Sequence, residues 1–145
     1  MKPAFELFQH TADMGIRAIA SSFEELLEAG ARGLYSIIGE LACTETPEKE
    51  VELSFFASDR AALFRDFLAE LLFLFSVKSQ VAGSITVIKF TESELIAHIG
   101  LKTIDREASV VTCEVKAVTY HELRITQHQS ADRGQYVAAC VIVDI

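Results

Sequence analysis

The last residues of the chain carry two acidic groups that could bind a cation together. Residues 141–145, with the sequence VIVDI, look like a buried strand that stops on an acid. Asp144 and the α-carboxylate of Ile145 place two anionic oxygen groups within one residue, and hard cations such as Ca²⁺ and Mg²⁺ prefer such ligands. The alternative is a solvated end without a role, because chain ends are commonly disordered. A strand that stays apolar almost to its end argues against fraying.

A further acid, Asp13, closes the motif HTAD at residues 10–13. The flanking residues predict a strand up to His10 and another over 15–20, with residues 11–13 as the turn between them. A carboxylate at this strand end could face a cleft and take part in chemistry. It could also cap the turn by accepting hydrogen bonds from backbone N–H groups, and by residue type alone this is the simpler interpretation.

The segment KAVTYH at residues 116–121 combines an ammonium, a phenol and an imidazole. Such groups can hold a phosphate or move protons. Strand alternation separates Tyr120 from His121, so these two residues and Lys116 can converge only if the chain bends near Ala117. The spacing is equally compatible with Tyr120 in the core and His121 at the surface.

Familiar catalytic signatures are absent from the sequence. It contains no GxxxxGK[ST], GxGxxG, HExxH or GxSxG pattern, and no candidate nucleophile has an adjacent base. The 3 cysteines, Cys43, Cys113 and Cys140, form no CxxC pair, which argues against a disulfide framework or a zinc knuckle. We therefore expect reduced, mostly buried thiols.

The charge balance is acidic, with 13 Lys and Arg against 21 Asp and Glu and a net charge of −8. Nucleic-acid affinity comes largely from Lys and Arg displacing counterions, so strong direct RNA binding is disfavoured. An acidic surface suits docking on a basic protein or binding of hard cations. No apolar run approaches the roughly 20 residues that span a bilayer, and the first residues lack a signal peptide's apolar stretch. We therefore expect a cytoplasmic protein.

Periodicity predicts two helices that bury large apolar side chains. Ser22 and Glu25 form a capping box that begins a helix over 22–38, and Gly39 ends it. A second helix, over about 59–77, has an apolar face broad enough for deep burial. The side chains expected in the core are Phe23, Leu27, Leu34, Phe64, Phe67, Leu71 and Phe75.

Alternation with a period of two predicts strands over much of the remaining chain. It is found at 51–55, 85–90, 95–101, 118–126 and 136–143, with a hairpin connection at 131–134. The 145 residues suit one domain, 1–145. The predicted fold is α+β, a two-layer sandwich in which two core helices pack on one face of a largely antiparallel sheet.

Taken together, four segments resemble the archease family over essentially the whole chain. HTAD resembles the family's opening motif, and residues 63–73 resemble its leucine-rich central helix. Residues 114–121 are similar to its most distinctive block, and residues 141–145 to its ending. The run at 100–105, and Tyr136 where many members have Trp, depart from the family pattern.

The resemblance implies an accessory protein that is not itself an enzyme. It would activate the GTP-dependent RNA ligase of tRNA splicing or RNA repair by promoting guanylylation of the ligase's active-site histidine and multiple turnover. The implied metal site, for Ca²⁺ or another divalent cation such as Mg²⁺, maps onto Asp13, Asp144 and Ile145. Lys116, with Tyr120 and His121, is our candidate for contacting a nucleotide phosphate or the ligase.

Two other functions compete with this interpretation. A metal-dependent hydrolase or nuclease could use Asp13, Asp144 and His121, since a metal held by carboxylates can activate water. Against it, the sequence offers only these two carboxylate positions and no second set of metal ligands. A chaperone-like interaction module would prevent ligase aggregation stoichiometrically and would be indifferent to Asp13.

Overall fold

The computed structural model describes residues 1–10 and 13–145. The HTAD motif therefore lies partly outside the described residues, since Thr11 and Ala12 are not among them. The α+β class predicted from the sequence is confirmed. In chain order the elements are β1 (Ala4–His10), β2 (Asp13–Ala20), α1 (Phe23–Ile38), β3 (Gly39–Glu40), β4 (Lys49–Phe56), α2 (Arg60–Lys78), β5 (Gln80–Phe90), β6 (Glu94–Thr103), β7 (Val110–Val111), β8 (Ala117–Val118), β9 (Arg124–Ser130) and β10 (Gly134–Asp144).

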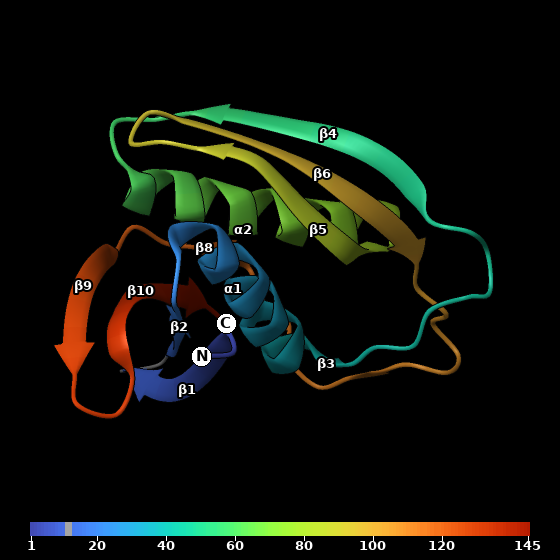
Figure 1. Ribbon diagram of the computed structural model, residues 1–145. Helices are drawn as coiled ribbons and strands as arrows, with labels where there is room; N and C mark the ends of the chain where they lie inside the picture. Colours follow the sequence, from blue (N-terminus) through green and yellow to red (C-terminus); the bar gives the residue numbers. More distant parts are fainter. Residues whose placement is uncertain (11–12) are drawn as a thin grey trace.

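The strands form two larger sheets, where we expected the helices to pack on one. One sheet has the order β1-β2-β10-β8, with β9 also paired to β10, and the other has the order β4-β6-β5. A short ladder joins β3 to β7, and every pairing between the described strands is antiparallel. Figure 1 shows α1 and α2 between the two larger sheets. Alternation shows that a strand has one buried face but does not reveal which strands pair, so the division could not be predicted from it.

Both helices begin at caps that the sequence encodes. The Ser22 hydroxyl accepts a hydrogen bond from the Glu25 N–H at 3.4 Å, which confirms the Ser22 half of the predicted capping box. The Glu25 carboxylate differs from the prediction, because it accepts from the Ser22 hydroxyl at 2.9 Å in place of a backbone N–H. Asp59 caps α2 by accepting from the Ala62 N–H at 2.8 Å. Helix α2 ends at Ser79, whose left-handed backbone has a φ of 54°. The caps thus fix both helices close to their predicted bounds.

The predicted core is confirmed with one exception. Phe23 is only half-buried; the Arg60 guanidinium lies 4.1 Å from its ring centroid. All the other side chains expected in the core are buried: Leu27, Leu34, Phe64, Phe67, Leu71 and Phe75. None of the helices in the described part of the chain is long and apolar enough to cross a membrane.

The three cysteines are free thiols, as expected. Cys140 is buried, but Cys43 and Cys113 are only half-buried, so the expectation of mostly buried thiols is wrong for these two. Burial raises the pKa of the Cys140 thiol, and this effect outweighs the opposing influence of the Arg124 guanidinium.

Candidate functional site

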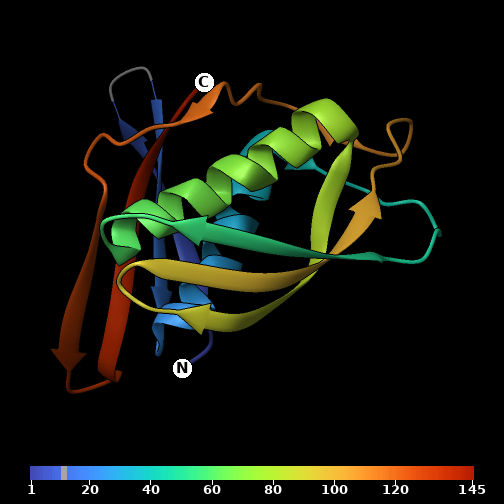
Figure 2. The same cartoon turned by 90° about the horizontal axis from the view of Figure 1, so that it is seen from above.

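The two acids singled out in the sequence meet at one edge of the five-stranded sheet. Asp13, the first residue of β2, is the direct antiparallel partner of Asp144, the last residue of β10. Direct partners point to the same face of a sheet, with Cβ atoms about 4.5–5.5 Å apart. Figure 2 shows the end of β10 beside the start of β2. Asp13 is half-buried and Asp144 exposed, so a solvated ion can reach both carboxylates.

The end of the chain is held rather than frayed. Ile145 is half-buried and packs against the buried core. Asp144, which precedes it, lies in a strand paired on both sides, with Asp13 on one side and Ala117 on the other. This arrangement agrees with the expectation that the apolar ending is anchored.

The short strand β8 brings the KAVTYH segment to the same edge. Ala117 is the direct partner of Asp144, and the Lys116 N–H donates to the Asp144 carbonyl at 2.7 Å. Thr119 donates to the Ile142 carbonyl from its N–H at 2.9 Å and from its hydroxyl at 2.8 Å. The exposed Lys116 is therefore tied through its backbone to the residue that carries the candidate ligand.

The possible metal ligands at this edge are oxygen atoms, which suit a hard cation. Asp144 and the α-carboxylate of Ile145 are the two groups that the sequence itself suggested, and Asp13 is the third group that the resemblance adds. Among the described residues, no group of three or more His, Cys, Asp or Glu side chains has the geometry of a metal site. A metal here would thus need the main-chain carboxylate, or ligands supplied by water or a partner.

Tyr120 and His121 lie in a turn rather than on a strand. The Leu123 N–H donates to the Tyr120 carbonyl at 3.4 Å, and Glu122 has a φ of 53°, so the strand predicted over 118–126 is broken. Both side chains are exposed, which contradicts the alternative that placed Tyr120 in the core. The His121 N–H donates to the Thr119 hydroxyl at 3.2 Å. Because Tyr120 and His121 do not lie in a strand, strand alternation does not determine the direction of their side chains.

Arg65 on α2 contacts this segment and was missed in the sequence. Its Nε donates to the Val118 carbonyl at 2.9 Å, and its Nη1 donates to the Tyr120 hydroxyl at 3.0 Å. The guanidinium lies 4.4 Å from the Tyr120 ring centroid and pairs with Asp66 at 2.8 Å. The available signal was weak: Arg65 and Asp66 are adjacent charged residues, on a helix that also carries Arg60, Glu70 and Lys78.

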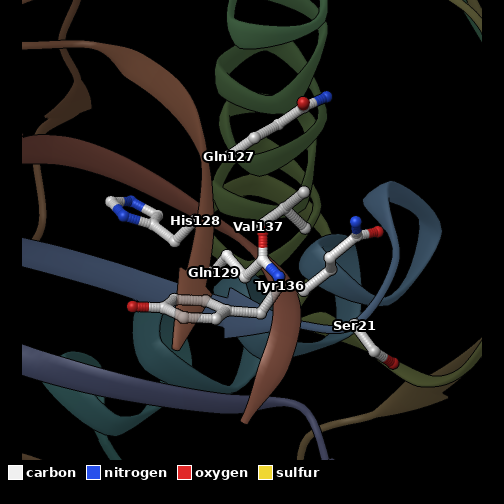
Figure 3. Close-up of a pocket in the computed structure, with 7 residues that line it drawn as sticks. Ser21, Gln127, His128, Gln129, Tyr136 and Val137 are labelled. Carbon is white, nitrogen blue, oxygen red and sulfur yellow. The ribbon is translucent and has the colours of Figure 1, made fainter. Parts of the chain in front are cut away.

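A separate hollow of about 400 Å³ lies at the β9–β10 hairpin. Figure 3 shows its lining, in which the His128 and Tyr136 rings stack with centroids 5.0 Å apart. The His128 ring also contacts the Thr126 hydroxyl at 2.6 Å. Because Tyr136 lies near the start of β10 and Asp144 at its end, the hollow does not belong to the acidic edge.

The chain is a small α+β protein in which Asp13 and Asp144 are cross-strand partners at one sheet edge. The sequence profile of the archease protein family matches residues 5–145. An archease of Thermococcus gammatolerans is 38% identical over 125 residues, covering 83% of this chain and 87% of that protein. An archease of Pyrococcus abyssi is 36% identical over 141 residues, covering 94% and 96%. The chain therefore belongs to the archease family.

Solved structures agree with this assignment. The solution structure of protein 1598 of Methanobacterium thermoautotrophicum superposes with a TM-score of 0.73 at 28% identity, covering 100% of both chains. An archease of Thermotoga maritima, described as a possible chaperone, superposes with a TM-score of 0.60 at 21% identity, covering 97% of this chain and 96% of that one. The second likeness concerns the fold alone.

Proposed function

We propose that this chain is a non-catalytic activator of a GTP-dependent RNA ligase in tRNA splicing or RNA repair, acting in the cytoplasm. It promotes guanylylation of the ligase's active-site histidine and sustains multiple turnover. The observation that carries the proposal is the register that sets Asp13 opposite Asp144, with Lys116 tied to Asp144 through the backbone. Membership of the archease family supports it.

The proposed mechanism is positioning. The acidic edge, with a divalent cation such as Ca²⁺ or Mg²⁺, enters the ligase's nucleotide pocket and places metal or GTP for attack by the ligase histidine. Holding reactants in the right geometry can supply about 7–11 kcal/mol of a reaction barrier, so an activator needs no nucleophile of its own. Lys116 contacts a nucleotide phosphate or a carboxylate of the ligase. The net charge of −8 suits docking on a basic surface.

The test mixes the chain with the ligase from the same source, GTP and a divalent metal, and measures covalent ligase–guanylate. The wild-type chain should raise the amount formed, and Asp13→Asn should abolish this gain. Glu50→Gln, at an exposed site on β4 in the other sheet, is the matched control and should activate fully. Activation that is indifferent to Asp13 would contradict the proposal.

Two further assays test the rival functions. Turnover of RNA or phosphoesters by the chain without ligase would favour a metal-dependent hydrolase. Light scattering of the ligase would reveal a chaperone-like role, which the description of the Thermotoga maritima archease as a possible chaperone suggests for that protein. A chaperone would suppress aggregation stoichiometrically and leave the guanylylation rate per folded ligase unchanged.

A further inference from the structure

We propose that Arg65 is a positioning residue for this edge: from α2 it holds β8 in place and so presets the arrangement that the ligase meets. The inference rests on the proposed function, because it assigns Arg65 a part in presenting Lys116 and Asp144. It goes beyond the KAVTYH segment itself, since Arg65 lies on a helix far from that segment in the sequence.

Strand β8 needs support from its outer side. It is only two residues long and lies at the edge of its sheet, where β10 is its one strand partner among the described residues. Backbone groups of successive strand residues face opposite edges. The Thr119 N–H faces β10, so the Val118 carbonyl faces away from it, and there it accepts the Nε–H of Arg65 at 2.9 Å. Arg65 thus occupies the position that a further strand would take.

The same guanidinium also fixes the turn after β8. Nη1 of Arg65 donates to the Tyr120 hydroxyl, while the cation lies over the Tyr120 ring. Asp66 pairs with the same nitrogen and balances the charge. Tyr120 remains 64% exposed, so a partner can contact it while Arg65 holds it. The planar guanidinium of Arg65, with its fork of several N–H donors, makes these contacts together, which the single ammonium of a lysine cannot do.

Helix α2 gives Arg65 a rigid base. Phe64 and Leu68, which lie beside Arg65 on this helix, are fully buried. The helix packs against both larger sheets, including β8 itself. Arg65 therefore links a helix anchored in the buried core to the short edge strand that pairs with Asp144.

The expected consequence of losing this link is a lower population of the docking-competent arrangement. When only a fraction of a protein is competent, the apparent dissociation constant rises by the inverse of that fraction. The arrangement reached in the complex stays the same, because the ligase restores it on binding. Arg65→Ala should therefore raise the concentration needed for half-maximal activation and leave the maximal rate of guanylylation unchanged.

The first measurement is a titration of each variant against the ligase with GTP and divalent metal. We expect Arg65→Ala to raise the half-saturating concentration about tenfold at an unchanged plateau. Arg65→Lys should shift it in the same direction, since it keeps the charge but loses the fork. Arg106→Ala is the matched control: Arg106 also donates to a side chain, Ser79, and lies over the Phe75 ring, near the other end of α2.

The second measurement is hydrogen exchange of the free chain. The Lys116 and Thr119 amides, which bond to β10, should exchange faster in Arg65→Ala and Arg65→Lys than in the wild type. The amides that join β2 to β10 should keep their rates. If Arg65→Ala fails to fold, Arg65→Lys provides both measurements.

The outcomes separate this inference from the proposed function. A wild-type chain that does not activate the ligase overturns both. Full activation by the wild type, together with unchanged half-saturation or unchanged amide exchange in the Arg65 variants, overturns the inference alone. A lower plateau with unchanged half-saturation also overturns it, because that result indicates a loss of folded protein rather than of positioning.

Discussion

Asp13 on β2 and Asp144 on β10 lie directly opposite each other in the antiparallel ladder that joins these strands. The pairing brings acids from the two ends of the sequence to one sheet edge. Direct partners point to the same face of the sheet, so one cation could bind both carboxylates. The first two predictions follow from this geometry.

Asp144→Asn should fold normally but lose cation binding and ligase activation. The asparagine keeps the size and one acceptor while it removes the charge that a hard cation needs. Mutating a residue that only orients a metal ligand typically lowers metal affinity about 10–100-fold. Loss of a ligand itself should cost at least as much, so we expect Ca²⁺ binding to weaken by at least about tenfold. Calorimetric titration and the guanylylation assay measure the two losses. Asp132→Asn, at the exposed β9–β10 turn, is the control, and equal effects of both variants would refute a specific role for Asp144.

A single glycine added after Ile145 should have a similar effect. The extension turns the α-carboxylate of Ile145 into a neutral amide and moves the terminal charge away from Asp144. The core is untouched, so the free energy of unfolding should change by less than about 1 kcal/mol. A glycine added before the exposed Met1 is the control. Parental Ca²⁺ affinity and activation in the C-terminal variant would remove Ile145 from the site.

Local features of the fold could be predicted from the sequence because their causes are local. Ser22 and Asp59 each cap a helix through a hydrogen bond to a residue three positions later. Both helices begin directly after these capping residues. The pairing of Asp13 with Asp144 is different, because register between distant strands depends on tertiary structure. Only the resemblance to the archease family brought these two acids together in advance.

The parts of the site that the sequence did not reveal depend on distant contacts or on local backbone geometry. Tyr120 was assigned by strand alternation, but the positive φ of Glu122 breaks the strand and exposes the phenol. Arg65, beside Asp66, gave only a weak signal, because charged side chains on a helix are ordinarily solvated. Its role becomes visible only when α2 packs beside β8 and the Val118 carbonyl meets the guanidinium.

Leu71→Ala tests the assignment of the core. Leu71 is fully buried on α2, so its truncation removes apolar contacts and leaves a cavity. We expect the free energy of unfolding to fall by about 2–5 kcal/mol, measured by urea denaturation. Phe73→Ala on the same helix is the control. Phe73 is 47% exposed, so its truncation should lower the free energy of unfolding by less than about 1 kcal/mol. Similar losses in the two variants would show that α2 is not oriented as described.

Tyr35 should make stability depend on alkaline pH. Its hydroxyl accepts a hydrogen bond from the Ala82 N–H at 2.9 Å, and burial raises the pKa of Tyr35 from 10.0 to about 12. Below pH 10 both folded and unfolded chains keep the phenolic proton, so this contribution is fully present. Between about pH 10 and 12 the unfolded chain releases the proton first, so stability falls as the pH rises.

Tyr35→Phe isolates this effect, because phenylalanine has no proton to release. Two pKa units correspond to about 3 kcal/mol, so the difference in unfolding free energy between wild type and variant should change by about that amount across this range, in favour of the variant. Other groups that titrate there affect both proteins equally and cancel in the difference. Urea denaturation at a series of pH values gives this difference directly. A difference that stays constant with pH would mean that water reaches the Tyr35 hydroxyl in the folded protein, and that α1 and β5 do not close over it.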